Sequence, residues 1–560
     1  MYRDRIRLWP FFLIALSCAG SGFSRQTAAP APKVTSVRQF DAPCAKCHHQ
    51  IYQQYLATPM ANASGLATDG ITPGTYSDAP SGITYRVLQR DGAAWLRYDR
   101  AGDENLHGEQ KLEYFMGSGN HARTYLYSIN GYWFEMPIAY YREKGSYDMR
   151  PSFQGQKEMP FNLPQNAACM RCHMNGAQVE DPGTRNHYKG LPFLHGGIAC
   201  EDCHGDASGH VAHGGNGSIL NPAKLDAERQ VGVCLLCHLE GDVSVEHRGR
   251  SIMNYKPGDR IADYISYFVR SGAGGTNRGV SQVEGLYLST CKRMSGAKMS
   301  CTTCHDPHSS PTAEERTSFY RTKCLTCHTD AKYATTHFNS TPDCTSCHMR
   351  KREAPDLAHS AWTDHRILAR PDEVAPSQTH GGAVELISVP GVTSEATPRD
   401  VAVAYYQLVA AGEMSVAERA RGLLEDVARS DPGDSDVVAD LGFLAYLRGD
   451  PQKAAVFYES ALSFDPNNFN VAIDLGVLLA RSGNLQRAAD LWSGTFGSNE
   501  DITELGMNVA TSQCSLGERT AAEDALRRVL IYSPDHRAAQ QELNAIKSGH
   551  QTCPPRSDGK

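Results

Sequence analysis

The chain has 560 residues, too many for one ordinary hydrophobic core, which predicts roughly two to four domains. Its formal net charge is −7, charged residues make up 21%, and no long basic run occurs, so nucleic acid is not an expected partner. The unusual content is its 18 cysteines and 22 histidines.

The first residues have the layout of a signal peptide. Arginines at positions 3, 5 and 7 precede an apolar stretch from Leu8 to Leu16, which is too short for a comfortable membrane span. We expect cleavage between Ala19 and Ser24. Lipid attachment at Cys18 is the alternative, and such a lipid is the only membrane anchor that we expect. The mature chain is therefore predicted to be periplasmic or otherwise extracytoplasmic.

Composition and periodicity divide the rest of the chain. Two Pro-rich linkers separate the signal peptide, a Cys- and His-rich domain and a helical domain. The predicted layout is signal peptide, linker, cysteine-rich domain, linker, helical repeats and tail, at residues 1–24, 25–39, 40–370, 371–396, 397–546 and 547–560.

A small antiparallel β insertion is expected at about 80–145, between the first two cysteine pairs. Residues 83–100 and 123–141 each predict two strands around a tight turn. Asp91-Gly92 and Asn130-Gly131 supply the turns, because these dipeptides favour two-residue hairpin loops.

Residues 397–546 follow a 34-residue period. Leu-Gly pairs at 441–442 and 475–476 each come before an alanine twelve residues later, and prolines end the repeats at 432, 466 and 534. The alanines recur in register at Ala420, Ala454, Ala488 and Ala522. This pattern resembles the tetratricopeptide repeat (TPR), a helix-turn-helix unit that stacks into a solenoid and often binds protein or peptide ligands.

Cys-x-x-Cys occurs seven times, and histidine follows every copy. The spacing within residues 324–348 fits a zinc ribbon, but neither zinc ribbons nor disulfides need that histidine. Covalent c-type haem does, because two thiols bind the porphyrin edge and the next imidazole binds the iron. The sequence thus predicts seven haems c. They would be attached through Cys44, Cys47, Cys169, Cys172, Cys200, Cys203, Cys234, Cys237, Cys301, Cys304, Cys324, Cys327, Cys344 and Cys347. The expected proximal iron ligands are His48, His173, His204, His238, His305, His328 and His348.

The remaining histidines are candidates for the sixth iron position, with a surface or propionate-binding role as the alternative for each. Met60 is the candidate at the first haem, where it would raise the potential; an ordinary buried methionine is the alternative. The histidine candidates near the motifs are His195, His210, His213, His247, His308, His337, His359 and His365.

Several stretches together carry a family resemblance. CAKCHHQIYQQY, FMGSGNHARTYLYSINGYWFEMPIAYY, HGGIACEDCHG, CTTCHDPH and CHMRK…TDHRI resemble multihaem cytochromes c related to the tetrahaem nitrification cytochrome and to hydroxylamine oxidoreductase. The resemblance covers roughly residues 40–370. It implies closely packed haems that pass electrons, and it implies distal ligands at His195, His210, His308, His337 and His365. The chain differs from the enzymes of this group in three ways. It has seven motifs, it has Met60 where a histidine is common, and it has no motif for a lysine-ligated catalytic haem.

The expected fold is therefore mainly α: a loop-rich multihaem cytochrome c domain with a small antiparallel β insertion, followed by an all-α TPR solenoid. The favoured function is an electron carrier between redox partner proteins, with the repeats for docking. The alternative is an oxidoreductase for a small nitrogen or sulfur compound, with one open haem and His121, Arg123 and Tyr125 as conceivable pocket residues. A haem-based redox sensor is a third possibility.

Overall fold

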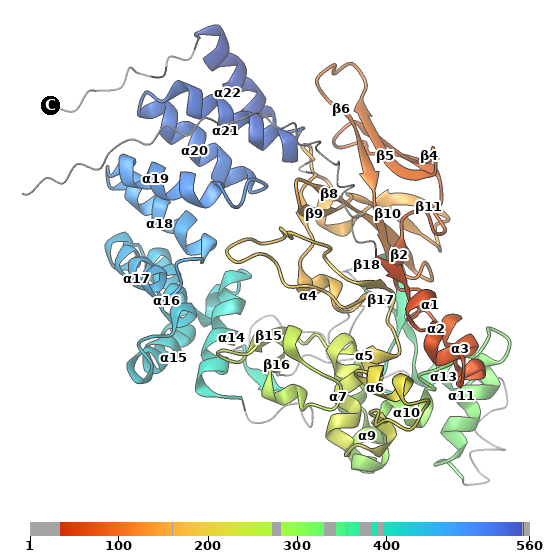
Figure 1. The fold of residues 1–560 in the computed structure, drawn as a ribbon. Coiled ribbons are helices and arrows are strands. Elements are labelled where there is room, and N and C mark those ends of the chain that lie inside the picture. The colour runs from red at the N-terminus through yellow and green to blue at the C-terminus, as the bar shows by residue number, and fades with distance from the viewer. Residues whose placement is uncertain are drawn as a thin grey trace, which may run out of the picture. The chain divides into compact units, whose positions relative to one another are not determined.

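The computed structural model confirms the expected fold class: antiparallel sheets lie in the N-terminal part and the C-terminal part is all-helical (Figure 1). The predicted signal peptide, most of both predicted linkers and His337 lie outside the described residues. The structure describes residues 34–159, 161–271, 282–329, 343–354, 357–369, 384–389, 396–550 and 553.

A four-stranded antiparallel sheet forms where the first hairpin was expected. Its order is β3-β4-β5-β6, at Gly74–Ser77, Ile83–Arg90, Ala93–Arg100 and His107–Leu112. Asp91 and Gly92 both have positive φ angles, 52° and 72°, which the two-residue turn requires. Ile83, Tyr85 and Val87 alternate into the core, so one face of β4 is buried.

A seven-stranded sheet follows, and its strands come from a longer part of the sequence than the predicted insertion at about 80–145. Its central hairpin turns at Asn130-Gly131, as expected, with φ angles of 52° and 86°. Its outer strands are only two to four residues long, too short for a detectable alternation of side chains. The strands are β2 (Ser64–Leu66), β7 (Tyr114–Met116), β8 (Ala122–Ile129), β9 (Tyr132–Glu135), β10 (Ile138–Tyr141), β11 (Ser146–Met149) and β12 (Leu163–Pro164).

The rest of the cytochrome region consists of short helices and small β pairs joined by loops. β1 (Thr35–Ser36), β14 (His195–Gly196) and β13 (Met174–Asn175) form one small sheet, and β17 (Lys351–Ala354) pairs with β18 (Leu357–Thr363). The helices are α1 (Val37–Phe40), α2 (Ala42–Ala45), α3 (His49–Leu56), α4 (Ala167–Met170), α5 (Glu201–His204), α6 (Ser208–Ala212), α7 (Ala227–His238), α8 (Gln282–Leu288), α9 (Thr290–Ser295), α10 (Cys301–Cys304), α11 (Arg316–Leu325) and α13 (Cys344–His348).

The TPR region is a run of antiparallel helix pairs. The four periodic alanines are all fully buried, which lets neighbouring helices approach closely. A Cβ atom on Gly442 would lie 2.6 Å from the Tyr458 ring, and one on Gly476 would lie 2.2 Å from Trp492, so both Leu-Gly pairs need their glycine. The helices are α14 (Pro398–Ala410), α15 (Ala417–Ser430), α16 (Ser435–Leu447), α17 (Pro451–Phe464), α18 (Phe469–Arg481), α19 (Leu485–Phe496), α20 (Thr503–Ser515), α21 (Arg519–Tyr532) and α22 (Arg537–Ser548).

The TPR region packs against the cytochrome region at its first helix. α14 contributes Ala402 and Tyr405 to a cluster that also contains Val245 and Phe268. These last two residues come from a three-stranded sheet of β15 (Val243–Glu246), β16 (Ile265–Arg270) and β19 (Leu386–Ser388). β19 lies within the segment expected to be a linker, so part of that segment is a strand.

A second contact joins the last repeats to the β region. Tyr532, at the end of α21, is buried in the same cluster as Phe134 and Tyr132. Arg100 forms an ion pair with Asp535 at 2.7 Å, and Arg185 forms one with Asp501 at 2.7 Å. Both carboxylates are almost completely buried, at 2% and 0% exposed. These contacts fix the end of the solenoid on the β-sheets.

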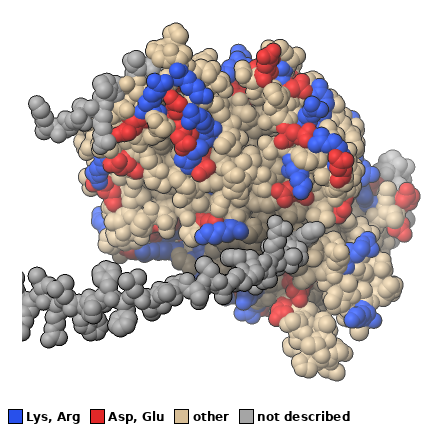
Figure 2. Space-filling view, turned by 45° about the horizontal axis from the view of Figure 1, so that its top comes forward, with Lys and Arg blue, Asp and Glu red and all other residues tan. Residues whose placement is uncertain are grey.

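Cys514 and Cys553 form a disulfide that ties the C-terminal tail to α20. Among the described residues, no helix is both long and apolar enough to cross a bilayer. On the face that Figure 2 shows, acidic and basic side chains are interspersed, and neither kind forms one large patch.

Candidate haem sites

Every motif overlaps a helix. The third, fifth and seventh motifs coincide with α5, α10 and α13, the first joins α2 to α3, and the second, fourth and sixth lie at the C-terminal ends of α4, α7 and α11. The amide of His48 donates to the Cys44 carbonyl at 2.8 Å, and His204 bonds Cys200 in the same way at 2.9 Å. Residues i, i+3 and i+4 of a helix share one face, so both thiols and the imidazole of a motif point to one side. At the second motif, the Asn166 side chain accepts from the Cys169 amide at 3.1 Å and caps this turn. The local chain thus presents the three groups that covalent haem attachment uses.

The motifs also lie close to one another. Thiols of different motifs are close enough to shift each other's pKa: Cys44 and Cys200, Cys172 and Cys237, Cys234 and Cys301, and Cys324 and Cys344. Cys203 and Cys234 interact electrostatically, and so do Cys304 and Cys327. Every motif is therefore a neighbour of at least one other. The first, third, fourth, fifth, sixth and seventh form one connected series, and the second joins it at the fourth.

Three proximal histidines face a second imidazole. The ring centres of His48 and His210 are 6.5 Å apart with planes 18° from parallel. The corresponding values are 6.0 Å and 17° for His204 and His308, and 6.2 Å and 28° for His305 and His365. Metal–imidazole bonds of about 2 Å on each side, plus roughly 1 Å from nitrogen to ring centre, place two axial imidazoles about 6 Å apart. The three pairs thus have the spacing of rings on either side of one iron.

The backbone holds several of these rings by Nδ1. Nδ1 of His204 donates to the Leu220 carbonyl, and Nδ1 of His210 donates to the Gly217 carbonyl, both at 2.9 Å. His365 bonds Thr363 in the same way at 2.9 Å. Such a bond fixes the tautomer and leaves the lone pair of Nε2 for a metal, as in most metal-binding histidines.

Burial keeps several of these imidazoles neutral. Burial, together with the nearby His365 and His238, lowers the pKa of His305 to about 4. It also lowers the pKa of His173, His238 and His308. A histidine binds iron only as the neutral base, so these environments suit ligation.

The other sixth-position candidates have different surroundings. Met60 packs beside Phe40 and Ala45 against a small apolar cluster, and the ring that faces His48 belongs to His210. His210, and not Met60, is thus the residue whose ring is stacked beside His48. His195 stacks on Phe40 at 3.7 Å, and its Nδ1 hydrogen-bonds to the Thr35 hydroxyl. The Nδ1 contact of His195 thus resembles that of a metal-binding histidine, but the ring that it stacks on is a phenylalanine and not a second imidazole.

In two further candidate histidines, Nε2 is hydrogen-bonded to another side chain. Nε2 of His247 lies 2.9 Å from the Ser266 hydroxyl, and Nε2 of His359 lies 2.8 Å from Asp148. His213 is exposed beyond the end of α6, with Nδ1 on the Gly209 carbonyl.

The four cysteines of the stretch first compared with a zinc ribbon, at positions 324, 327, 344 and 347, are all among the described residues and do not gather into a metal site. Within the described ranges, the one group of three side chains close enough to hold a metal ion is Asp41, Cys44 and Cys200. Its two thiols belong to different haem motifs, and thioether formation would consume both.

The residues considered as an enzyme pocket do not converge on one. The Arg123 guanidinium donates to the carbonyls of Gly70 and Ser118, both at 3.0 Å, and lies over the Phe115 ring. His121 stacks on Trp362, and Tyr125 is fully buried. Packing and loop closure account for all three side chains.

Comparison with protein-family models finds two matches in the cytochrome region. Residues 295–333 match the doubled CXXCH motif, and residues 140–205 match the family of cytochrome c554 and c-prime. The chain carries covalently bound haem c. The two matches cover the second, third, fifth and sixth motifs, and they agree with the thiol and imidazole placement described above. No curated protein sequence matched this chain.

Solved structures similar to this one match about a quarter of the chain. MamA is 19% identical over 24% of this chain and 78% of its own, with a TM-score of 0.23. YrrB, described as a TPR protein with an unusual peptide-binding site, is 18% identical over 27% and 77%, with a TM-score of 0.25. Pseudomonas aeruginosa pilF is 17% identical over 27% and 70%, with a TM-score of 0.25.

Proposed function

We propose that this chain is an extracytoplasmic seven-haem cytochrome c that carries electrons between redox partners, one of which docks on the TPR region. The observation that carries the proposal is the arrangement of three facing imidazole pairs within one connected set of seven motifs. Haem iron supplies one-electron redox chemistry when bound. The chain contributes the axial ligands, their backbone hydrogen bonds and the burial that set the potential.

Distal ligands are part of the proposal. His210, His308 and His365 serve the irons bound by His48, His204 and His305. Bis-histidine ligation at these positions leaves no open site, which suits transfer of electrons rather than binding of substrate. A relationship to the hydroxylamine oxidoreductase group also belongs to the proposal, and the order of the sequence motifs supports it.

Extracytoplasmic location has support from two kinds of cysteine chemistry. Attachment of haem to CxxCH takes place outside the cytoplasm, and the Cys514–Cys553 disulfide is typical of an oxidising compartment. Fractionation of cells that produce the full chain, followed by haem staining of each fraction, tests the location.

One observation favours the enzyme as a second candidate. Among the described residues, the aromatic contacts of His173 and His238 include no second imidazole. Electron paramagnetic resonance (EPR) of the oxidised protein separates the two functions. A purely low-spin spectrum supports the carrier, and a stoichiometric high-spin signal that changes on addition of nitrite or hydroxylamine supports the enzyme.

A further inference from the structure

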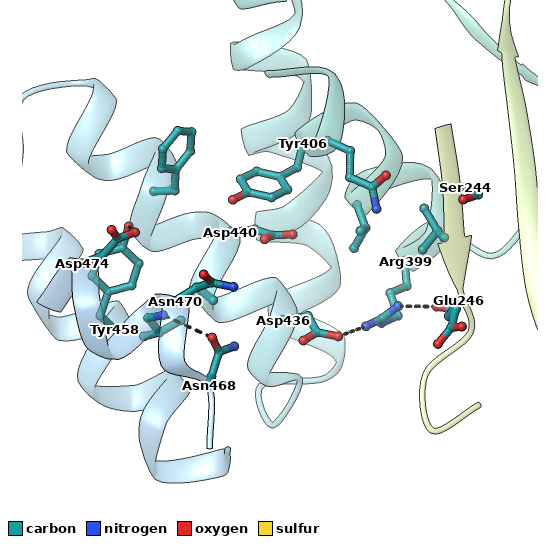
Figure 3. Close-up of a pocket in the computed structure, with 16 residues that line it drawn as sticks. Ser244, Glu246, Arg399, Tyr406, Asp436, Asp440, Tyr458, Asn468, Asn470 and Asp474 are labelled. Atoms are coloured by element: carbon teal, nitrogen blue, oxygen red, sulfur yellow. Dashed lines mark hydrogen bonds and ion pairs between the residues drawn. The ribbon is translucent and has the colours of Figure 1, made fainter. Parts of the chain in front are cut away.

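A pocket of about 450 Å³ lies between β15 and helices α14, α16, α17 and α18. Most of its lining residues come from the first helix of three successive helix pairs and from the adjoining strand, and Tyr458 comes from α17. Figure 3 shows Tyr406, Asp440 and Asp474 around the same space, with Arg399 and Asp436 on its other side. None of the lining residues belongs to a CxxCH motif, so the pocket is separate from the haem sites.

The charge of the lining is predominantly negative. It contains four carboxylates, Glu246, Asp436, Asp440 and Asp474, and a single cation, Arg399. That cation is already neutralised, because its guanidinium binds Asp434 at 2.5 Å and Asp436 at 2.7 Å. Within the described part of the chain, Glu246, Asp440 and Asp474 form no ion pair, so the lining has an excess of acidic groups.

Asp440 is the unusual member of this surface. This residue is more than nine-tenths buried, and its Oδ2 has no hydrogen-bond partner among the residues that the structure describes. Burial raises the pKa of Asp440 well above its ordinary value, and burial also raises that of Asp474. An unpartnered carboxyl in a helix interface destabilises the fold, so a bound cation would relieve this cost.

Aromatic rings complete the surroundings of these carboxyls. The Tyr458 hydroxyl donates to Asp474 at 3.3 Å, and the Tyr406 ring meets the edge of Phe443 at 5.8 Å. Carboxylates beside aromatic faces bind ammonium and guanidinium groups through both ion pairing and cation–π attraction. At the rim, the exposed amide of Asn470 can pair with a peptide backbone.

A metal ion does not suit this pocket. The carboxylates are too far apart, since the described part of the chain brings three potential ligand atoms together only at Asp41, Cys44 and Cys200. A long, flexible cation that reaches a buried carboxyl from the groove fits the arrangement better, and lysine and arginine side chains have this form.

We propose that this groove binds an extended segment of a partner protein by taking up one lysine or arginine side chain between Asp440, Asp474 and Tyr406. The inference rests on the proposed docking function of the repeats and adds the chemistry of the partner. It predicts that the partner presents a basic segment, and that salt weakens the complex.

Calorimetric titration of the full-length, haem-loaded protein tests the proposal. The probe is a short blocked peptide of alternating lysine and alanine, and the comparison peptide has glutamate in place of lysine. We expect binding of the lysine peptide alone. Asp440→Asn and Asp474→Asn should each weaken it about tenfold or more, since a charge-assisted contact is lost. Asp426→Asn, on the exposed face of α15, is the matched control and should bind as the wild type does.

The contrary outcomes are distinct. Equal binding by the control and the Asp440→Asn variant, or no binding of the lysine peptide, would overturn the inference. Binding of the glutamate peptide would overturn it too, while leaving the docking function standing. The electron-transfer proposal is tested separately, by measuring reduction of the haems in the same samples.

Discussion

The imidazole of His210 lies nearly parallel to that of His48, with ring centres 6.5 Å apart. His210 is on α6, and its Nδ1 is fixed by the Gly217 carbonyl. Removal of this ring should open the sixth position of one iron while six haems keep their ligands. We therefore expect His210→Ala to add one high-spin haem to the EPR spectrum of the oxidised protein.

His213→Ala is the control for that variant, because His213 is exposed and only three residues further along the chain. It should leave the spectrum unchanged. His210→Met provides a second readout, since methionine in place of histidine raises the haem potential, and one titration step should move upward. A spectrum that is identical for the wild type and His210→Ala would exclude His210 as a ligand.

Loss of one thioether should affect one haem. Cys327 is exposed at the sixth motif, so Cys327→Ala removes an attachment without emptying the core. We expect six haems to stay fully attached and the sixth motif's haem to be lost in part under denaturing conditions. Haem quantification by absorbance and intact mass checks this. Loss of every haem would show instead that the cytochrome region matures only as a cooperative unit.

The end of the TPR solenoid should depend on its buried ion pairs. Asp535 is 2% exposed, binds Arg100 and also accepts the Met159 amide at 2.8 Å. Asp535→Ala leaves the buried Met159 amide without its acceptor and leaves Arg100 with Asp103 as its remaining partner, so it should cost about 3 kcal/mol. Denaturant unfolding, followed by helix content, measures the loss. Asp426→Ala breaks the exposed pair with Arg429 and should cost less than about 1 kcal/mol.

The contribution of Asp440 to the free energy of unfolding should fall as the pH rises, because its buried carboxyl is stable only while protonated. Burial raises the folded-state pKa of Asp440, so the native state holds this proton more tightly than the unfolded chain does. The stabilising effect of the proton is complete below about pH 4 and is lost as the pH rises toward the folded-state pKa. Asp440→Asn removes the effect.

Unfolding of wild type and Asp440→Asn at two pH values checks the sign. The two proteins should be similarly stable near pH 4, and the variant should be the more stable at pH 7. A variant that is less stable than the wild type at pH 7 would mean that Asp440 has a stabilising partner in the folded protein.

Features coded by adjacent residues were predictable from the sequence. A CxxCH motif needs five consecutive positions, the hairpin turns need Asp91-Gly92 and Asn130-Gly131, and the TPR helices follow the 34-residue period. In each case the physical cause acts over one turn, one loop or one repeat. The structure confirms the two hairpins and the repeated helix pairs.

Features that depend on distant contacts were not predictable in this way. Met60 is near the first motif in sequence, whereas the ring that faces His48 belongs to His210, on a separate helix. Asp501 and Asp535 look like ordinary surface acids in the repeats, yet both are buried against the β region. Asp440 gives no local signal, because only the packing of α14, α16 and α18 together makes it an unpaired buried carboxyl.

Intact mass of the purified full-length protein under denaturing conditions tests the central claim most directly. Denaturation removes every ligand that is held without a covalent bond, so only attached groups remain. The account predicts a single species that exceeds the polypeptide mass by seven haems. An unmodified polypeptide, or a species that carries fewer than seven haems after maturation in a c-type cytochrome host, would contradict it.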